Sequence, residues 1–166
     1  MEHFKAYLPL CWFIGNPLEQ PRSIRFFQYN LLYYLLIELF IQINITDDPF
    51  EAIFEVLLEV ALSFAFISAL LLHKKAMPCF IATSTSFIFC ENIQASLILP
   101  NLVWLLSTSD VVSYYFMAIL VFYSVCMITY LIKQVLYAPL TPALVLTLVY
   151  LTLTYLGSYV FYNALF

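Results

Sequence analysis

Apolar residues occur along this chain in five long runs, separated by short polar or proline-containing breaks. The runs cover residues 26–45, 50–72, 76–99, 111–132 and 140–165. Each has about the 20 residues that a helix needs to cross roughly 30 Å of hydrocarbon. Asp48 and Asp110 precede two of the runs as typical helix N-caps, whereas Pro100 is expected to end the third. The pattern predicts an all-α, polytopic transmembrane helix bundle with five spans.

Polar residues interrupt the third and fifth runs. The third run contains Thr and Ser at residues 83–86, followed by Glu91, so we expect neighbouring helices to shield it from lipid. An alternative is a re-entrant hairpin, which is tolerated only inside protein or beside water. In the fifth run, a polar stripe at helical spacing predicts a helix–helix contact face. Its members are Thr147, Tyr150, Thr154 and Ser158.

The first 25 residues are predicted to form a cytoplasmic or interfacial segment of a single transmembrane domain, residues 1–166. The apolar stretch at residues 7–14 is short and contains Pro9, so it does not fit a cleavable signal peptide. Trp12 favours a position at the membrane interface, where tryptophan is enriched. No break between the runs is long enough for a separate soluble domain.

The six cations all fall on one side of the predicted membrane if the chain crosses it five times. They are Lys5, Arg22, Arg25, Lys74, Lys75 and Lys133. Asp47, Asp48 and Asp110 then fall on the other side. Short loops rich in Lys and Arg stay in the cytoplasm. We therefore predict a cytoplasmic N-terminus and a C-terminus outside, most simply in a bacterial inner membrane, with an organellar inner membrane as the alternative.

Composition agrees with a membrane protein, because 64% of the 166 residues are hydrophobic and only 10% are charged. Soluble domains have about 45–50% apolar and about 25% charged residues. The four cysteines form no C-x-x-C pair and are expected to be small buried hydrophobes rather than disulfide or metal ligands. No nucleophile–base constellation, metal spacing or glycine-rich phosphate loop is present. We expect no catalytic site, no cofactor and no nucleic-acid partner.

Carboxylates inside the apolar runs are the candidate functional residues. Glu55 and Glu59 share one face of the second run, together with Glu51, which lies at the interface near a helix start. At about 1.5 Å per residue, they lie as deep in the outer half of the membrane as Glu38 and Glu91. The predicted acidic cluster is Glu38, Glu55, Glu59 and Glu91, with Gln42, Asn92 and Gln94 as supporting polar residues.

No cation of the chain reaches that layer under the five-span arrangement, so the acidic charge needs compensation of another kind. A charged side chain near the bilayer centre costs about 2.5–3.5 kcal/mol on insertion scales. The carboxyl groups are either protonated and hydrogen-bonded, or matched by a basic residue of a partner or a lipid amine. The remaining alternative is a transported proton or metal cation in a water-filled cavity.

Two functions follow from these alternatives. The first is a non-catalytic membrane subunit, scaffold or assembly factor. Its acidic cluster would meet a basic residue of a membrane-protein partner in the outer half of the membrane, or the chain would form a homo-oligomer. The second is a small proton- or cation-coupled transporter or channel that uses the four glutamates.

The layout of the chain resembles that of the bacterial relatives of the Yip family. The resemblance lies in the five spans, the short N-terminal segment and the proline-marked entry at residues 16–27. Residues 73–85, followed by the Pro100 break, also resemble small proteobacterial inner-membrane proteins. The scarcity of glycine, at two residues, departs from a Yip-like chain. The resemblance implies a five-helix scaffold or trafficking role without catalytic residues, and it assigns no site.

Overall fold

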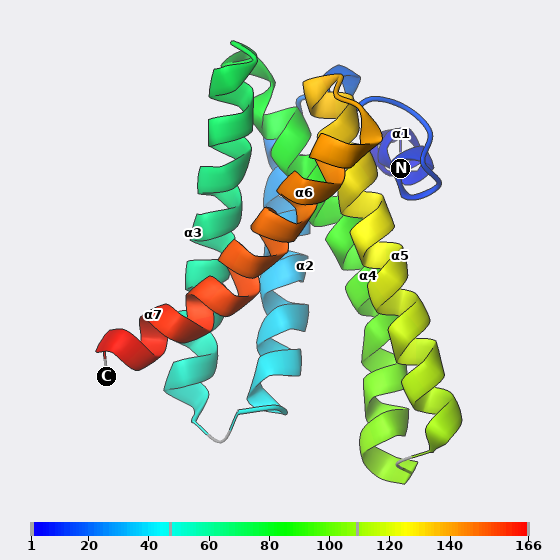
Figure 1. The fold of residues 1–166 in the computed structure, drawn as a ribbon, viewed down its shortest axis with the longest axis vertical. Coiled ribbons are helices and arrows are strands. Elements are labelled where there is room, and N and C mark those ends of the chain that lie inside the picture. The colour runs from blue at the N-terminus through cyan, green and yellow to red at the C-terminus, as the bar shows by residue number, and fades with distance from the viewer. Residues whose placement is uncertain (1, 47, 109, 166) are drawn as a thin grey trace.

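The computed structural model describes residues 2–46, 48–108 and 110–165, and all of its regular elements are helical (Figure 1). Asp47, which was predicted to lie outside the membrane, is not among the described residues. The elements are α1 (Glu2–Cys11), η1 (Pro17–Glu19), α2 (Ile24–Ile43), α3 (Pro49–His73), η2 (Met77–Cys79), α4 (Phe80–Thr108), α5 (Val111–Leu136), α6 (Leu140–Leu151), η3 (Thr152–Leu156) and α7 (Gly157–Leu165). The elements η1 and η2 are 3₁₀ helices, and η3 is a π-helical segment.

Four helices are long and apolar enough to cross a bilayer: α2, α3, the stretch Met77–Thr108 that ends in α4, and α5. Asp48 and Asp110 cap α3 and α5, as predicted, because their side chains accept hydrogen bonds from Phe50 N and Val112 N. The chain is therefore a multi-pass membrane protein with an all-helical fold.

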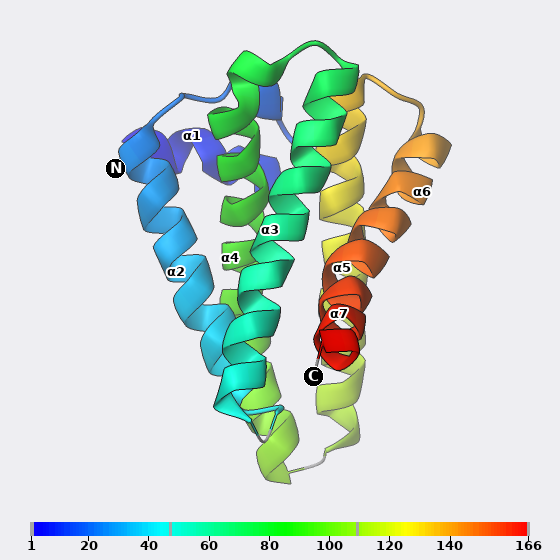
Figure 2. The same ribbon diagram turned by 90° about the vertical axis from the view of Figure 1, so that its left-hand side faces the viewer.

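The last predicted span, residues 140–165, is helical but is less clearly a span. Its apolar stretch, Leu140–Leu156, falls short of a full crossing. Both ribbon views show α6 starting where α5 ends and α7 stopping before it reaches the other end of the bundle (Figure 1, Figure 2). Length and composition identify four candidate spans, and the fifth stays a prediction.

The prediction that Pro100 ends the third helix is wrong, and so is the re-entrant alternative. Helix α4 runs without interruption from Phe80 to Thr108, with Pro100 inside it. A proline removes one backbone donor, but a transmembrane helix continues through it when neighbouring helices hold both sides. Here the buried Asn101 side chain donates to the carbonyl oxygen of Ser113 on α5, at 3.3 Å, so the turn after the proline is fixed to its neighbour.

Helix α4 is the central helix of the bundle, as its polar residues required. It packs along both α2 and α5, and α1 lies across it (Figure 2). The polar run at residues 83–86 is fully buried. Thr85 and Ser86 donate to backbone carbonyls one turn earlier, at 2.6 and 2.8 Å. The polar face of the third run is thus turned away from lipid.

The N-terminal segment packs against the bundle instead of lying only at its surface. Tyr7 and Cys11 of α1 are buried, whereas Trp12 is 70% exposed, so it is free to face an interface. The Tyr7 hydroxyl donates to the carbonyl oxygen of Pro21 at 2.7 Å, and burial raises the pKa of Tyr7 to about 12. The Cys11 and Cys90 sulfurs lie 3.7 Å apart, which fixes α1 against α4.

The basic residues collect at one end of the bundle. Helices α2 and α4 begin, and α3 and α5 end, at the same end (Figure 2). The cations lie there: Arg22 and Arg25 at the start of α2, Lys74 and Lys75 after α3, Lys133 in the last turn of α5, and Lys5 in α1. Asp48 and Asp110 lie at the starts of α3 and α5, at the opposite end.

The contact between Cys11 and Cys90 gives a test of where α1 lies. Mild oxidation of the protein in membranes with copper–phenanthroline is expected to join these two thiols, because their sulfurs already touch. Peptide mass spectrometry would show the cross-linked pair, which Cys11→Ser and Cys90→Ser each remove. Cys126→Ser is the matched control, because Cys126 lies on α5 and is not fully buried. A link from Cys11 to Cys126 in place of Cys90 would contradict the packing of α1.

Candidate functional site

The predicted glutamates come from three helices, and all four turn toward the interior of the bundle. Glu38 lies on α2, Glu55 and Glu59 on α3, and Glu91 on α4. On α3 the four-residue spacing places Glu55 and Glu59 on the buried face, at 5% and 8% exposure, whereas Glu51 stays partly exposed. Glu91 is buried in the central helix, and Glu38 is partly buried.

Three of these carboxyl groups accept hydrogen bonds from neighbouring helices. Tyr34 of α2 donates to Glu59 Oε1 at 2.6 Å, and Tyr150 of α6 donates to Glu91 Oε1 at 2.7 Å. The Gln42 side chain of α2 donates to Glu55 Oε2. Tyr150 also shares a hydrogen bond of 3.1 Å with Ser63 of α3. The glutamates therefore connect α2 with α3 and α4 with α6, and the bond between Tyr150 and Ser63 connects these two pairs. They have this structural role whether or not they also bind a ligand.

The carboxyl groups of Glu38, Glu59 and Glu91, which we call the glutamate cluster, lie close enough to interact electrostatically. Glu55 lies at one edge of this cluster, between Glu59 and Glu51. Like charges repel strongly where the surroundings have a low dielectric constant. The cluster therefore cannot hold several negative charges without a proton or another cation.

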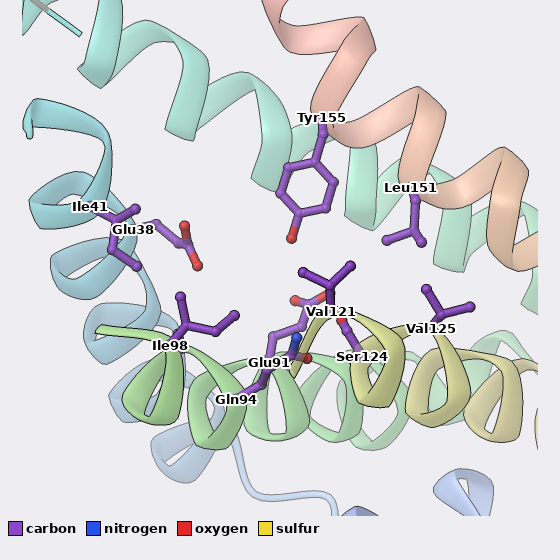
Figure 3. Close-up of a pocket in the computed structure, with 11 residues that line it drawn as sticks. Glu38, Ile41, Glu91, Gln94, Ile98, Val121, Ser124, Val125, Leu151 and Tyr155 are labelled. Atoms are coloured by element: carbon purple, nitrogen blue, oxygen red, sulfur yellow. The ribbon is translucent and has the colours of Figure 1, made fainter. Parts of the chain in front are cut away.

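Two members of the glutamate cluster, Glu38 and Glu91, line a cavity of about 340 Å³ between α2, α4, α5, α6 and η3 (Figure 3). We call it the acidic cavity. The other polar side chains on its wall are Gln94, Ser124 and Tyr155, and the rest of the wall consists of hydrocarbon side chains. Glu59 does not line it, and its carboxyl group accepts a hydrogen bond from Tyr34.

Several polar atoms on this wall have no partner among the residues that the structure describes. The side chain of Gln94 is only 6% exposed, and its Oε1 atom is buried without a hydrogen bond. The Glu38 carboxyl group and the Tyr155 hydroxyl likewise make no hydrogen bond to the described residues. Figure 3 shows both groups pointing into the cavity, toward Glu91. A buried polar atom without a partner costs free energy, so Gln94 Oε1 is typical of an atom that awaits a partner in a binding site.

The π-helical segment η3 brings Tyr155 to the cavity. One turn earlier, Leu151 lines the same cavity, while Thr154 is buried and bonds back to the Tyr150 carbonyl at 2.9 Å. Insertions of π-helix shift the register of a helix and recur at functional sites. The shift lets Thr154 stay on the packed face while the adjacent Tyr155 reaches the cavity.

The predicted contact face of the last helix is confirmed by the burial of all four of its members. Thr147, Tyr150, Thr154 and Ser158 are each at most 5% exposed. Thr147 forms a hydrogen bond of 3.0 Å with Thr129 of α5. Sequence reasoning missed the role of Tyr155 and the pairing of Tyr34 and Tyr150 with glutamates, because tyrosine is common throughout this chain.

The three supporting residues have separate roles. Gln42 binds Glu55, and Gln94 lines the acidic cavity while its amide nitrogen donates to the Leu120 carbonyl at 3.3 Å. Asn92 instead donates to the backbone carbonyl of Asn30, at 2.9 Å, and ties α4 to α2 away from the cavity. Among the described residues, no group of three His, Cys, Asp or Glu side chains is arranged to hold a metal ion.

No protein-family model, curated protein or solved structure matches this chain. The resemblance to the Yip family therefore stays a prediction, and the site has to be interpreted from its own residues.

Removing the Tyr150 hydroxyl tests whether the site stabilises the bundle. Tyr150→Phe leaves Glu91 Oε1 without its donor, so we expect a loss of about 1 kcal/mol. That value lies between the roughly 0.6 kcal/mol of an average interhelical bond in a membrane and the roughly 1–3 kcal/mol of an unpaired buried group. Reversible unfolding in mixed micelles would measure it. Tyr115→Phe, at a 70% exposed position on α5, is the control. Equal stability of the two variants would contradict the assigned bond.

Proposed function

We propose that the protein crosses the membrane five times, with a cytoplasmic N-terminus and an external C-terminus. The grouping of the basic residues at one end of the bundle supports this orientation, because Lys and Arg in short loops remain in the cytoplasm. The helical path through α6, η3 and α7 supports the fifth crossing. The glutamate cluster then lies within the membrane, away from every basic loop.

The function that the geometry supports best is that of a small proton- or cation-coupled transporter or channel. The observation that carries this proposal is that Glu38 and Glu91 line one cavity whose polar wall contains no Lys or Arg. Positive charge for this site has to come from outside the chain, and intramembrane carboxyl groups mark ion and proton pathways in many membrane proteins. A cavity between helices of a single chain is suited to a small ligand that enters and leaves.

The second candidate is the non-catalytic subunit, scaffold or assembly factor. In that case a Lys or Arg side chain of a partner helix supplies the positive charge. Tyr155, which is 49% exposed and lines the acidic cavity, is the observation that favours it, because the cavity is not sealed from the surface of the bundle there. Glu38 is then the first carboxyl group that an incoming basic side chain can pair with.

Replacing the two glutamates of the cavity separates the candidates. The double variant Glu38→Gln, Glu91→Gln keeps the side-chain shape and the acceptor for Tyr150 but removes both negative charges. Proton flux into liposomes under an imposed membrane potential, and the proteins recovered with the chain in mild detergent, should be measured together. For a transporter, the parent conducts, and the double variant falls to the rate of protein-free liposomes.

Glu51→Gln is the matched control, because Glu51 lies in the first turn of α3 and does not line the cavity. Flux in the parent that persists in the double variant would overturn the transport proposal. Absence of flux in every variant, with a co-purifying partner that only the double variant loses, would favour the subunit.

The topology gives an independent prediction. Reporter domains fused to the two ends of the chain are expected to lie in opposite compartments, the N-terminal one in the cytoplasm. A pair of reporters reads both positions: a disulfide-containing phosphatase that is active only outside the cytoplasm, and a fluorescent protein that fluoresces only inside it. Two reporters in the same compartment would show an even number of crossings, in agreement with the four candidate spans and against a fifth.

A further inference from the structure

We infer that the acidic cavity binds a protonated primary amine with a compact apolar body, rather than a metal ion. This inference rests on the proposed function, since it names the class of cation that the cavity takes. It concerns the ligand alone and does not require that the ligand be moved across the membrane.

The hydrogen-bonding groups of the cavity match an ammonium group. A primary ammonium has three N–H donors and no acceptor. The cavity presents three sets of acceptor oxygens from separate side chains: the carboxyl groups of Glu38 and Glu91, and the amide oxygen of Gln94. One of these, Gln94 Oε1, is buried and has no partner among the described residues. The one Glu91 oxygen that accepts from Tyr150 leaves the other available.

The remainder of the wall matches the rest of such a ligand. Side chains of Ile41, Ile98 and Leu151, with two valines of α5, form an apolar surface opposite and beside the polar groups (Figure 3). The volume of about 340 Å³ lies at the small end of the roughly 300–1,000 Å³ that is typical of small-molecule sites. Binding would bury the apolar body of the amine against these side chains while its charge meets the carboxylates.

A metal ion fits this wall less well. Mg²⁺ and Ca²⁺ need about six to eight oxygen ligands, and Mg²⁺ keeps several waters. The acidic cavity offers two carboxyl groups, and most of its surface is hydrocarbon, which cannot replace an inner hydration shell. A neutral molecule makes less use of this wall, because it gains no attraction from a carboxylate and leaves the glutamate cluster to be neutralised by protons alone.

The opening of the cavity beside Tyr155 is also suited to the entry of an amphipathic amine. Tyr155 is about half exposed, and its hydroxyl points into the cavity, so the ring lies between the surface of the bundle and the carboxyl groups. A ligand with an apolar body partitions into the bilayer and could reach the cavity from there.

Benzylamine is a suitable probe, with benzyl alcohol as the neutral match and benzyltrimethylammonium as a cation without N–H donors. Titration calorimetry of the purified protein in a nonionic detergent, with detergent alone subtracted, would measure binding. The parent is expected to bind benzylamine and to bind the other two compounds at least roughly tenfold more weakly, because charge-assisted hydrogen bonds are the strong ones.

Variants locate the binding. Glu38→Gln and Glu91→Gln are each expected to weaken benzylamine binding by roughly tenfold or more, whereas Glu51→Gln leaves it unchanged. Glu38→Gln should preserve the fold, because the Glu38 carboxyl group makes no hydrogen bond to the described residues. The elution volume and thermal unfolding of each variant verify this. Tyr155→Phe, which keeps both carboxyl groups, gives a second fold-neutral variant and is expected to weaken binding less than either glutamine substitution.

The outcomes distinguish this inference from the proposed function. Failure of the folded parent to bind benzylamine, or equal binding of benzyl alcohol, would overturn the amine assignment. Proton flux that still depends on Glu38 and Glu91 would leave the proposed function standing in that event. Benzylamine binding that persists in both glutamine variants would also contradict the inference, because the binding site would then lie elsewhere. Calcium or magnesium that displaces benzylamine from the parent would count against it in favour of a metal.

Discussion

Acidic side chains buried between apolar helices are the constraint on which the rest of this structure depends. A carboxylate is expensive to hold in the membrane unless it is neutralised or paired. The chain partly meets this cost with tyrosine and glutamine donors: Tyr34 binds Glu59, Tyr150 binds Glu91, and Gln42 binds Glu55. Glu38 is the exception, and it lies where a cavity begins.

The same hydrogen bonds explain why the helices pack as they do. Glycine is almost absent, so close approach of helix backbones contributes little, and large side chains fill the interfaces. Helix–helix specificity then comes from polar contacts that connect elements far apart in sequence, such as Tyr150 with Ser63 and Thr129 with Thr147. Helix α4, which carries most of the buried polar residues, has to be central, because any lipid-facing position would expose them.

The acidic cavity lies where some polar groups of the helices have no hydrogen-bond partner on a neighbouring helix. Between α2, α4 and α6, two carboxyl groups and an amide oxygen are left facing a space lined with hydrocarbon. The π-helical segment adds Tyr155 to that space and is the irregular element of an otherwise regular helix. Irregular helical geometry next to unpaired polar atoms is costly, and such local cost is characteristic of functional sites.

The sequence by itself determined the features that belong to one helix at a time. Run length and hydropathy predicted the four helices that are long and apolar enough to cross a membrane, and the helix caps predicted where α3 and α5 begin. The four-residue spacing predicted that Glu55 and Glu59 share a buried face. Only the tertiary structure decided that α4 continues through Pro100, that Cys11 touches Cys90, and that Tyr155 joins Glu38 and Glu91 at one cavity. The physical reason is that periodicity fixes which face of a helix is polar, whereas the tilt and rotation of each helix depend on packing against the others.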